Sequence, residues 1–173
     1  MKVLISSAFF LGLVALGSTH LCLVFPQQRG NVTGLDAAAA PDCYRVTGPC
    51  GGMDTAGHVR TVFQEGDMVS ITYQKNAGHW VAATPLQGYF AISLIKLSNH
   101  GGTLSAPQEL KRREDKNEPN LTIFSDAVQL PAGVHGHHII QVTYVTNNPA
   151  APAVFYQCAD VTINTRTGGG VVG

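Results

Sequence analysis

Alternating apolar and polar residues set the pattern of the chain from residue 68 onward. Over residues 68–74 every second side chain is apolar, which places Val69, Ile71 and Tyr73 on one face of a strand. Four further stretches are rich in β-branched and aromatic residues or alternate in the same way: 88–97, 121–125, 139–146 and 153–163. The turn residues at 147–150 separate the last two stretches, so we expect them to form a hairpin.

Helical periodicity is weak throughout the chain. Short strands separated by Gly- and Pro-rich turns are typical of an all-β fold, and we expect an antiparallel β-sandwich. Residues 20–58, rich in Gly, Pro, Asp and Ala, predict a loop-rich segment that leads into it. Residues 104–120 hold much of the charge and are interpreted as a solvated loop, in preference to a partner site. The Gly-rich residues 167–173 predict a flexible tail.

The first residues have the composition of a secretion signal. Lys2 precedes 14 apolar or small residues at 3–16, which is short for a membrane span and usual for a signal peptide. Cleavage after Thr19 would remove residues 1–19 and leave a domain of residues 20–166 that begins at His20. Cleavage after Gly17 is also chemically reasonable. No second long apolar run follows, so we expect a secreted, extracellular protein without a membrane span.

The balance of charged residues argues against one class of partner. Eleven basic and eleven acidic residues give a formal charge of zero, which argues against nucleic acid because phosphate binding needs a basic excess. Asn31 and Asn120 each begin an Asn-X-Thr triplet and are candidate glycosylation sites, as suits an exported protein.

The four cysteines all follow the signal segment. An even number in an oxidising compartment predicts two disulfides, for which three connectivities exist. We favour Cys22–Cys43 and Cys50–Cys158. A zinc site is the alternative, although the spacing lacks a paired CxxC.

His20 acquires a particular chemistry if it becomes the first residue. The α-amine and ring Nδ1 of an N-terminal histidine can chelate one metal, and a second imidazole would complete a planar set of three nitrogens that suits copper. The amine must be unblocked and deprotonated, so binding should weaken in acid.

Three segments carry a resemblance to a known family. Residues 20–30, HLCLVFPQQRG, resemble the opening of secreted copper proteins related to lytic polysaccharide monooxygenases, and more narrowly that of the copper acquisition factor family. Residues 48–52, GPCGG, and residues 155–161, FYQCADV, are similar to two later segments of that family. The resemblance implies an immunoglobulin-like or fibronectin-like β-sandwich that binds one copper ion per mature chain near its N-terminus.

The resemblance also implies a ligand set. The first ligand falls on His20, through its amine and Nδ1, and the second on His79 in the Gly-His-Trp sequence at 78–80. The third, an aspartate in the acquisition branch, matches Asp160 best. We therefore expect the rings of His20 and His79 to converge with a carboxylate nearby. The alternatives are a surface turn for His79 and a buried polar role for Asp160, bonded to backbone or to Arg29.

The other histidines are weaker candidates. His135, His137 and His138 form a dense cluster before a strand, which we interpret as structural in preference to a zinc or copper site. His58 is a minor alternative to His79, and His100 fits a turn.

Three functions remain open. The first is copper acquisition, delivery or buffering, with the copper ion as ligand and a membrane copper transporter or a glycan as candidate partner. The second is a copper-dependent lytic polysaccharide monooxygenase acting on chitin or a related glycan, and the third is a metal-free recognition module. The small size and the single tryptophan, Trp80, favour copper handling over polysaccharide oxidation. Whether the protein is an enzyme is left undecided.

Overall fold

The computed structural model describes residues 20–97 and 104–166. Within these ranges the chain forms strands and one short 3-10 helix, listed here in order: β1 (His20–Phe25), η1 (Pro41–Cys43), β2 (Thr61–Gln64), β3 (Met68–Ala77), β4 (Tyr89–Lys96), β5 (Gln108–Glu114), β6 (Thr122–Gln129), β7 (Gly136–Val145) and β8 (Val154–Asn164).

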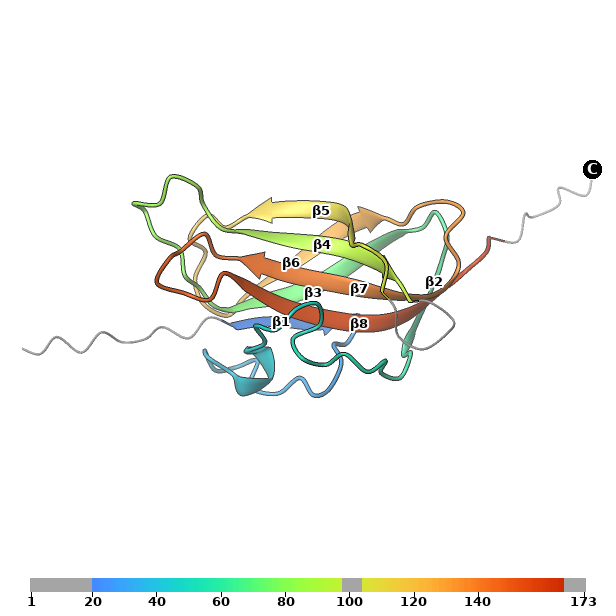
Figure 1. Cartoon of the computed structure of the whole chain (residues 1–173), viewed down its shortest axis with the longest axis horizontal. Coiled ribbons are helices and arrows are strands. Elements are labelled where there is room, and N and C mark those ends of the chain that lie inside the picture. Colours follow the sequence, from blue (N-terminus) through green and yellow to red (C-terminus); the bar gives the residue numbers. More distant parts are fainter. Residues whose placement is uncertain (1–19, 98–103, 167–173) are drawn as a thin grey trace, which may run out of the picture.

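The strands form two sheets that lie one over the other (Figure 1). One sheet has the order β1-β3-β6 and the other the order β2-β8-β7-β4-β5. Neighbouring strands are antiparallel, except that β2 runs parallel to β8. The expected all-β, immunoglobulin- or fibronectin-like β-sandwich is confirmed, with this one parallel pair added.

The core forms between the inward faces of the two sheets. Val69, Ile71 and Tyr73 of β3 are buried, as their alternation predicts. They pack with buried residues of the facing sheet, which include Phe90, Ile92, Ile140, Val142, Tyr144, Phe155 and Val161.

Most of the strand predictions are confirmed. The β7–β8 hairpin closes through the turn at 147–150, and β6 extends the short strand expected at 121–125. Two predictions were wrong in part. Residues 20–25, expected in a loop-rich segment, form β1 against β3, and residues 108–114, expected in a solvated loop, form β5 against β4. In both cases pairing with a distant strand supplies the structure, which local sequence does not encode.

Both expected disulfides form. Cys22 of β1 is bonded to Cys43 of η1, and Cys50 to Cys158 of β8. Between β1 and β2 the chain has no other regular structure, so the loop-rich, disulfide-tied segment is confirmed from residue 26 onward. Backbone bonds from Arg29 N to Cys158 O and from Tyr156 N to Arg45 O hold this segment along β8.

Several predictions fall outside the described residues. The signal peptide at 1–19, His100 and the tail at 167–173 lie there. Within the described part of the chain, no helix has the length and apolar character needed to cross a membrane.

Candidate metal centre

Two histidines from distant parts of the sequence lie at the same end of the sandwich. His20 begins β1 and pairs with Ala77, the last residue of the antiparallel strand β3. His79 follows two residues later, so strand register alone brings it back beside the start of β1. The β8 strand begins at this end as well and contributes Phe155.

A chain of aromatic rings connects the two imidazoles. The ring centroids are 5.1 Å apart for His20 and Tyr44, 5.8 Å for Tyr44 and Phe155, and 6.3 Å for Phe155 and His79. His20 is 3% exposed and Phe155 is fully buried, whereas Tyr44 is 45% exposed. The two histidines therefore lie beside an apolar floor, with one tyrosine at its rim.

The electrostatics of His79 favour a neutral ring. Burial lowers its pKa below the ordinary histidine value, and the nearby charge of His20 lowers it further. Its Nε2 atom is buried and has no hydrogen-bond partner among the described residues. Because buried polar atoms are nearly always paired, a neutral imidazole with an unpaired nitrogen fits a metal donor. The residues present thus fit a copper ion through nitrogen donors.

The backbone around His79 is held at three points. Gly78 N donates to Asn120 Oδ1 at 2.9 Å, His79 N donates to Tyr144 Oη at 3.2 Å, and Asn148 Nδ2 donates to His79 O at 3.1 Å. Sequence reasoning missed these roles. Asn120 was identified only as a glycosylation acceptor, and Asn148 only as a turn residue.

Asp160 does not join the two histidines. Its carboxylate accepts two hydrogen bonds of 2.7 Å from the Arg29 guanidinium and one of 2.8 Å from Gly57 N. Asp160 lies five residues beyond Phe155, about 16 Å along β8. Asp160 instead forms a buried ion pair with Arg29, the alternative role that the sequence left open.

The remaining histidines do not add ligands to this end of the sandwich. His58 is exposed and lines a cavity of about 250 Å³ beside Arg29 and Asp160. His138 is buried, with Nδ1 3.2 Å from Gly136 O, while His135 and His137 are exposed. In residues 20–97 and 104–166, no three His, Cys, Asp or Glu side chains are grouped to hold a metal.

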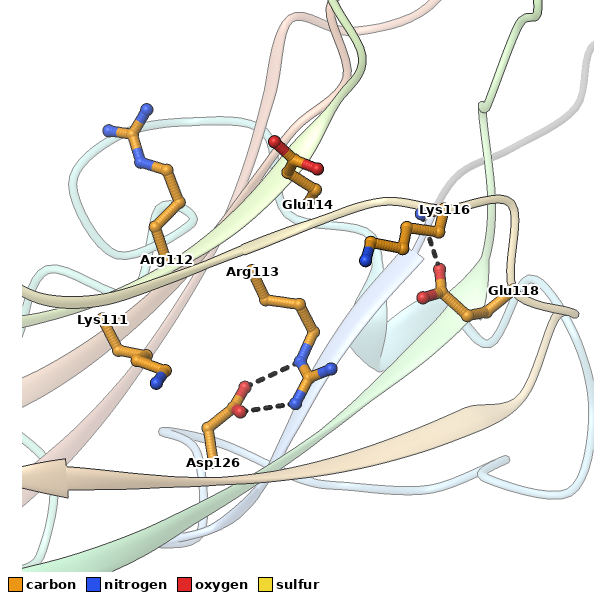
Figure 2. Close-up of a pocket in the computed structure, with 7 residues that line it drawn as sticks. All are labelled: Lys111, Arg112, Arg113, Glu114, Lys116, Glu118 and Asp126. Atoms are coloured by element: carbon orange, nitrogen blue, oxygen red, sulfur yellow. Dashed lines mark hydrogen bonds and ion pairs between the residues drawn. The ribbon is translucent and has the colours of Figure 1, made fainter.

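A charged recess lies elsewhere, between the edge strands β5 and β6 (Figure 2). Figure 2 shows Arg113 directed at Asp126, to which it donates two hydrogen bonds, while Arg112 and Glu114 point to the opposite side of β5. Lys111 and Lys116 add positive charge to the recess, and Glu118 adds negative charge. This mixed, solvent-exposed lining offers no counterpart to the histidine pair.

The sequence model of the family described as "Copper acquisition factor BIM1-like" matches residues 18–169. No curated protein matches the sequence.

Solved structures share the fold at low identity. An AA10 lytic polysaccharide monooxygenase from Streptomyces lividans superposes with a TM-score of 0.57 at 19% identity, covering 83% of this chain and 99% of its own. An AA10 enzyme of the same kind from Photorhabdus luminescens gives 0.57 at 16%, covering 85% and 100%. A chitin binding domain from Burkholderia pseudomallei gives 0.54 at 12%, covering 84% and 100%.

Proposed function

Because the chain belongs to the BIM1-like copper acquisition factor family, we propose that its mature form is a secreted protein that binds one copper ion and acquires, delivers or buffers it. Removal of residues 1–19 exposes the α-amine of His20 in this proposal. Copper is the cargo of the protein, and a membrane copper transporter is the candidate receiver.

One observation carries the ligand assignment. The buried Nε2 of His79, which has no hydrogen-bond partner in the described part of the chain, lies at the same end of the sandwich as His20, whose charge influences the pKa of His79. Amine and Nδ1 of His20 with Nε2 of His79 make three nitrogen donors for one ion. Asp160 is left out of this set, because Arg29 and Gly57 occupy its oxygens.

A second candidate function is polysaccharide oxidation, favoured by the likeness of fold to AA10 enzymes. It predicts that the copper-loaded protein releases oxidised oligosaccharides from chitin when a reductant and peroxide are supplied. Copper handling predicts copper binding without such products.

The experiment titrates Cu(II) into protein that begins at His20, by calorimetry and electron paramagnetic resonance (EPR). We expect one tight equivalent whose spectrum shows coupling to nitrogen. A matched chain whose His20 α-amine is acetylated keeps both rings but blocks the amine, and its affinity should fall by on the order of 100-fold or more. His79→Ala should have a similar effect, and His135→Ala, at an exposed position, none. Failure of the mature protein to retain copper would overturn the proposal.

A further inference from the structure

A buried ion pair lies next to the loop that carries His79. Lys75 Nζ of β3 is 2.5 Å from Oδ1 of Asp115, the residue after β5, and both side chains are 1% exposed or less. The Tyr144 hydroxyl of β7 donates to the other oxygen, Asp115 Oδ2. Side chains from β3, from β7 and from the residue after β5 thus meet in one buried hydrogen-bonded network.

The network ends at the backbone of His79. Tyr144 Oη uses its proton on Asp115 and its lone pair to accept the His79 N–H at 3.2 Å. Gly78 allows the loop to pass this close, because a Cβ there would lie 2.4 Å from Lys75 Cε. The network therefore fixes the backbone from which the His79 ring projects.

A second buried tyrosine–aspartate pair has an arginine in place of the lysine and makes no hydrogen bond to a histidine among the described residues. Tyr73 Oη donates to Asp126 Oδ2 at 2.8 Å, and Arg113 neutralises Asp126 (Figure 2). Tyr73 and Tyr144 are both fully buried and both pack against Phe90, with ring centroids 5.5 and 4.5 Å away. The hydroxyls differ in their relation to His79, because Tyr144 Oη accepts the His79 N–H and Tyr73 Oη does not.

We propose that Tyr144, held in place by Asp115 and Lys75, is a positioning residue that orients His79 for copper. This inference rests on the proposed function, since it assigns a role at the same site. A tyrosine needed only for packing could be a phenylalanine, whereas the hydroxyl of Tyr144 bridges a buried carboxylate and the ligand's own amide.

The experiment compares Tyr144→Phe with Tyr73→Phe in the mature protein. Each variant removes one buried hydroxyl from a Tyr–Asp pair and keeps the ring, so the two should lose similar thermal stability. Tyr144→Phe should weaken Cu(II) binding by about 10- to 100-fold and change the copper hyperfine coupling in EPR. It should also speed hydrogen exchange of the His79 amide in metal-free protein. Tyr73→Phe should leave all three readouts at wild-type values.

The outcomes separate the two proposals. A wild-type protein that binds no copper removes the proposed function, and this inference with it. Wild-type binding with equal affinity and EPR spectra for both variants removes the inference alone. If Tyr144→Phe does not fold, the pair Lys75→Met with Asp115→Asn takes its place, because it removes both charges together. This double variant should shift affinity and hyperfine coupling in the same direction, and an unchanged spectrum would overturn the inference.

Discussion

At the scale of single residues, Asp160 and Arg29 show how a buried charge depends on its partner. Both side chains are 4% exposed or less, and replacing Asp160 with Asn would leave the guanidinium buried without a counter-charge. We expect Asp160→Asn to lower the free energy of unfolding by about 3–5 kcal/mol while copper affinity stays within a few-fold of wild type.

Urea unfolding and copper titration of the same variant check this expectation. Asp67→Asn is the control, because its pair with Arg166 is exposed and should contribute about 0–1 kcal/mol. Lost copper binding in a fully stable Asp160→Asn protein would instead return Asp160 to the ligand set.

His138 gives a prediction on pH. Burial lowers the pKa of its ring, with smaller contributions from Lys96 and the two neighbouring histidines, against an opposing hydrogen bond to Gly136 O. The unfolded chain therefore takes up this proton first, near pH 6.5, and the folded chain only at lower pH.

Unfolding free energy of the metal-free protein should therefore fall as the pH drops below about 6.5. The loss at His138 is about 1.4 kcal/mol for each pKa unit of depression. His138→Gln should reduce the fall between pH 7.5 and 5.5, and the exposed control His137→Gln should not. Denaturant titrations at the two pH values measure this fall in unfolding free energy. An equal fall in the wild type and in both variants would contradict the prediction.

The site was predictable only where sequence pattern or family resemblance reached it. His20 and His79 could be named in advance from their motifs, and the structure brings them to one end. Tyr144 and Asn148 could not, because they contact His79 from 65 and 69 residues away and nothing local marks them. The Arg29 partner of Asp160, 131 residues away in sequence, was one of the alternatives that the sequence left open.

At the scale of elements, β5 is a strand that the alternation of apolar and polar residues does not predict. Charged residues dominate it, and only Leu110 packs against the core, so sequence favoured a loop. Pairing with β4 makes it a strand at the edge of its sheet. Lys111 and Arg113 point into the recess beside β6 (Figure 2), and charges at such an edge oppose pairing with another chain.

The two disulfides attach the loop-rich segment between β1 and β2 to the sandwich. They close loops that do not overlap, with sequence separations of 21 and 108 residues. The chain-entropy relation then gives about 3.3 kcal/mol for Cys22–Cys43 and about 4.8 kcal/mol for Cys50–Cys158.

Replacing Cys22 and Cys43 by alanine should therefore destabilise the protein less than replacing Cys50 and Cys158 by alanine. Urea unfolding of the two double variants measures both losses, and a quadruple variant should show their sum because the loops are separate. A larger loss for the Cys22–Cys43 pair would mean that native packing around β1 outweighs the entropy of the unfolded chain.

At the scale of the whole molecule, the antiparallel β1–β3 pair and the hairpins bring the ends of several strands together at one end of the sandwich. The fold could be predicted because alternation specifies which faces are buried. The order of strands within each sheet could not, since it is determined by packing between segments distant in sequence. The candidate metal centre depends on this arrangement, because His20 begins β1, His79 follows the end of β3, and antiparallel pairing places these two strand ends side by side.

Copper should therefore add stability to a fold that is already stable without the metal. The main core joins both sheets and includes neither His20 nor His79, so metal-free protein should unfold cooperatively. Free copper at a hundredfold excess over Kd should add about 2.7 kcal/mol to the unfolding free energy of the chain that starts at His20.

The chain with an acetylated His20 amine has the same core and the same rings, and its amine is blocked. Its weaker binding should give it a much smaller gain at the same copper concentration. Denaturant titrations of both chains with and without copper measure the difference. Equal stabilisation of the two chains by copper would mean that the ion binds at a site other than the His20 amine. A ligand stabilises the folded state only according to how tightly that state binds it.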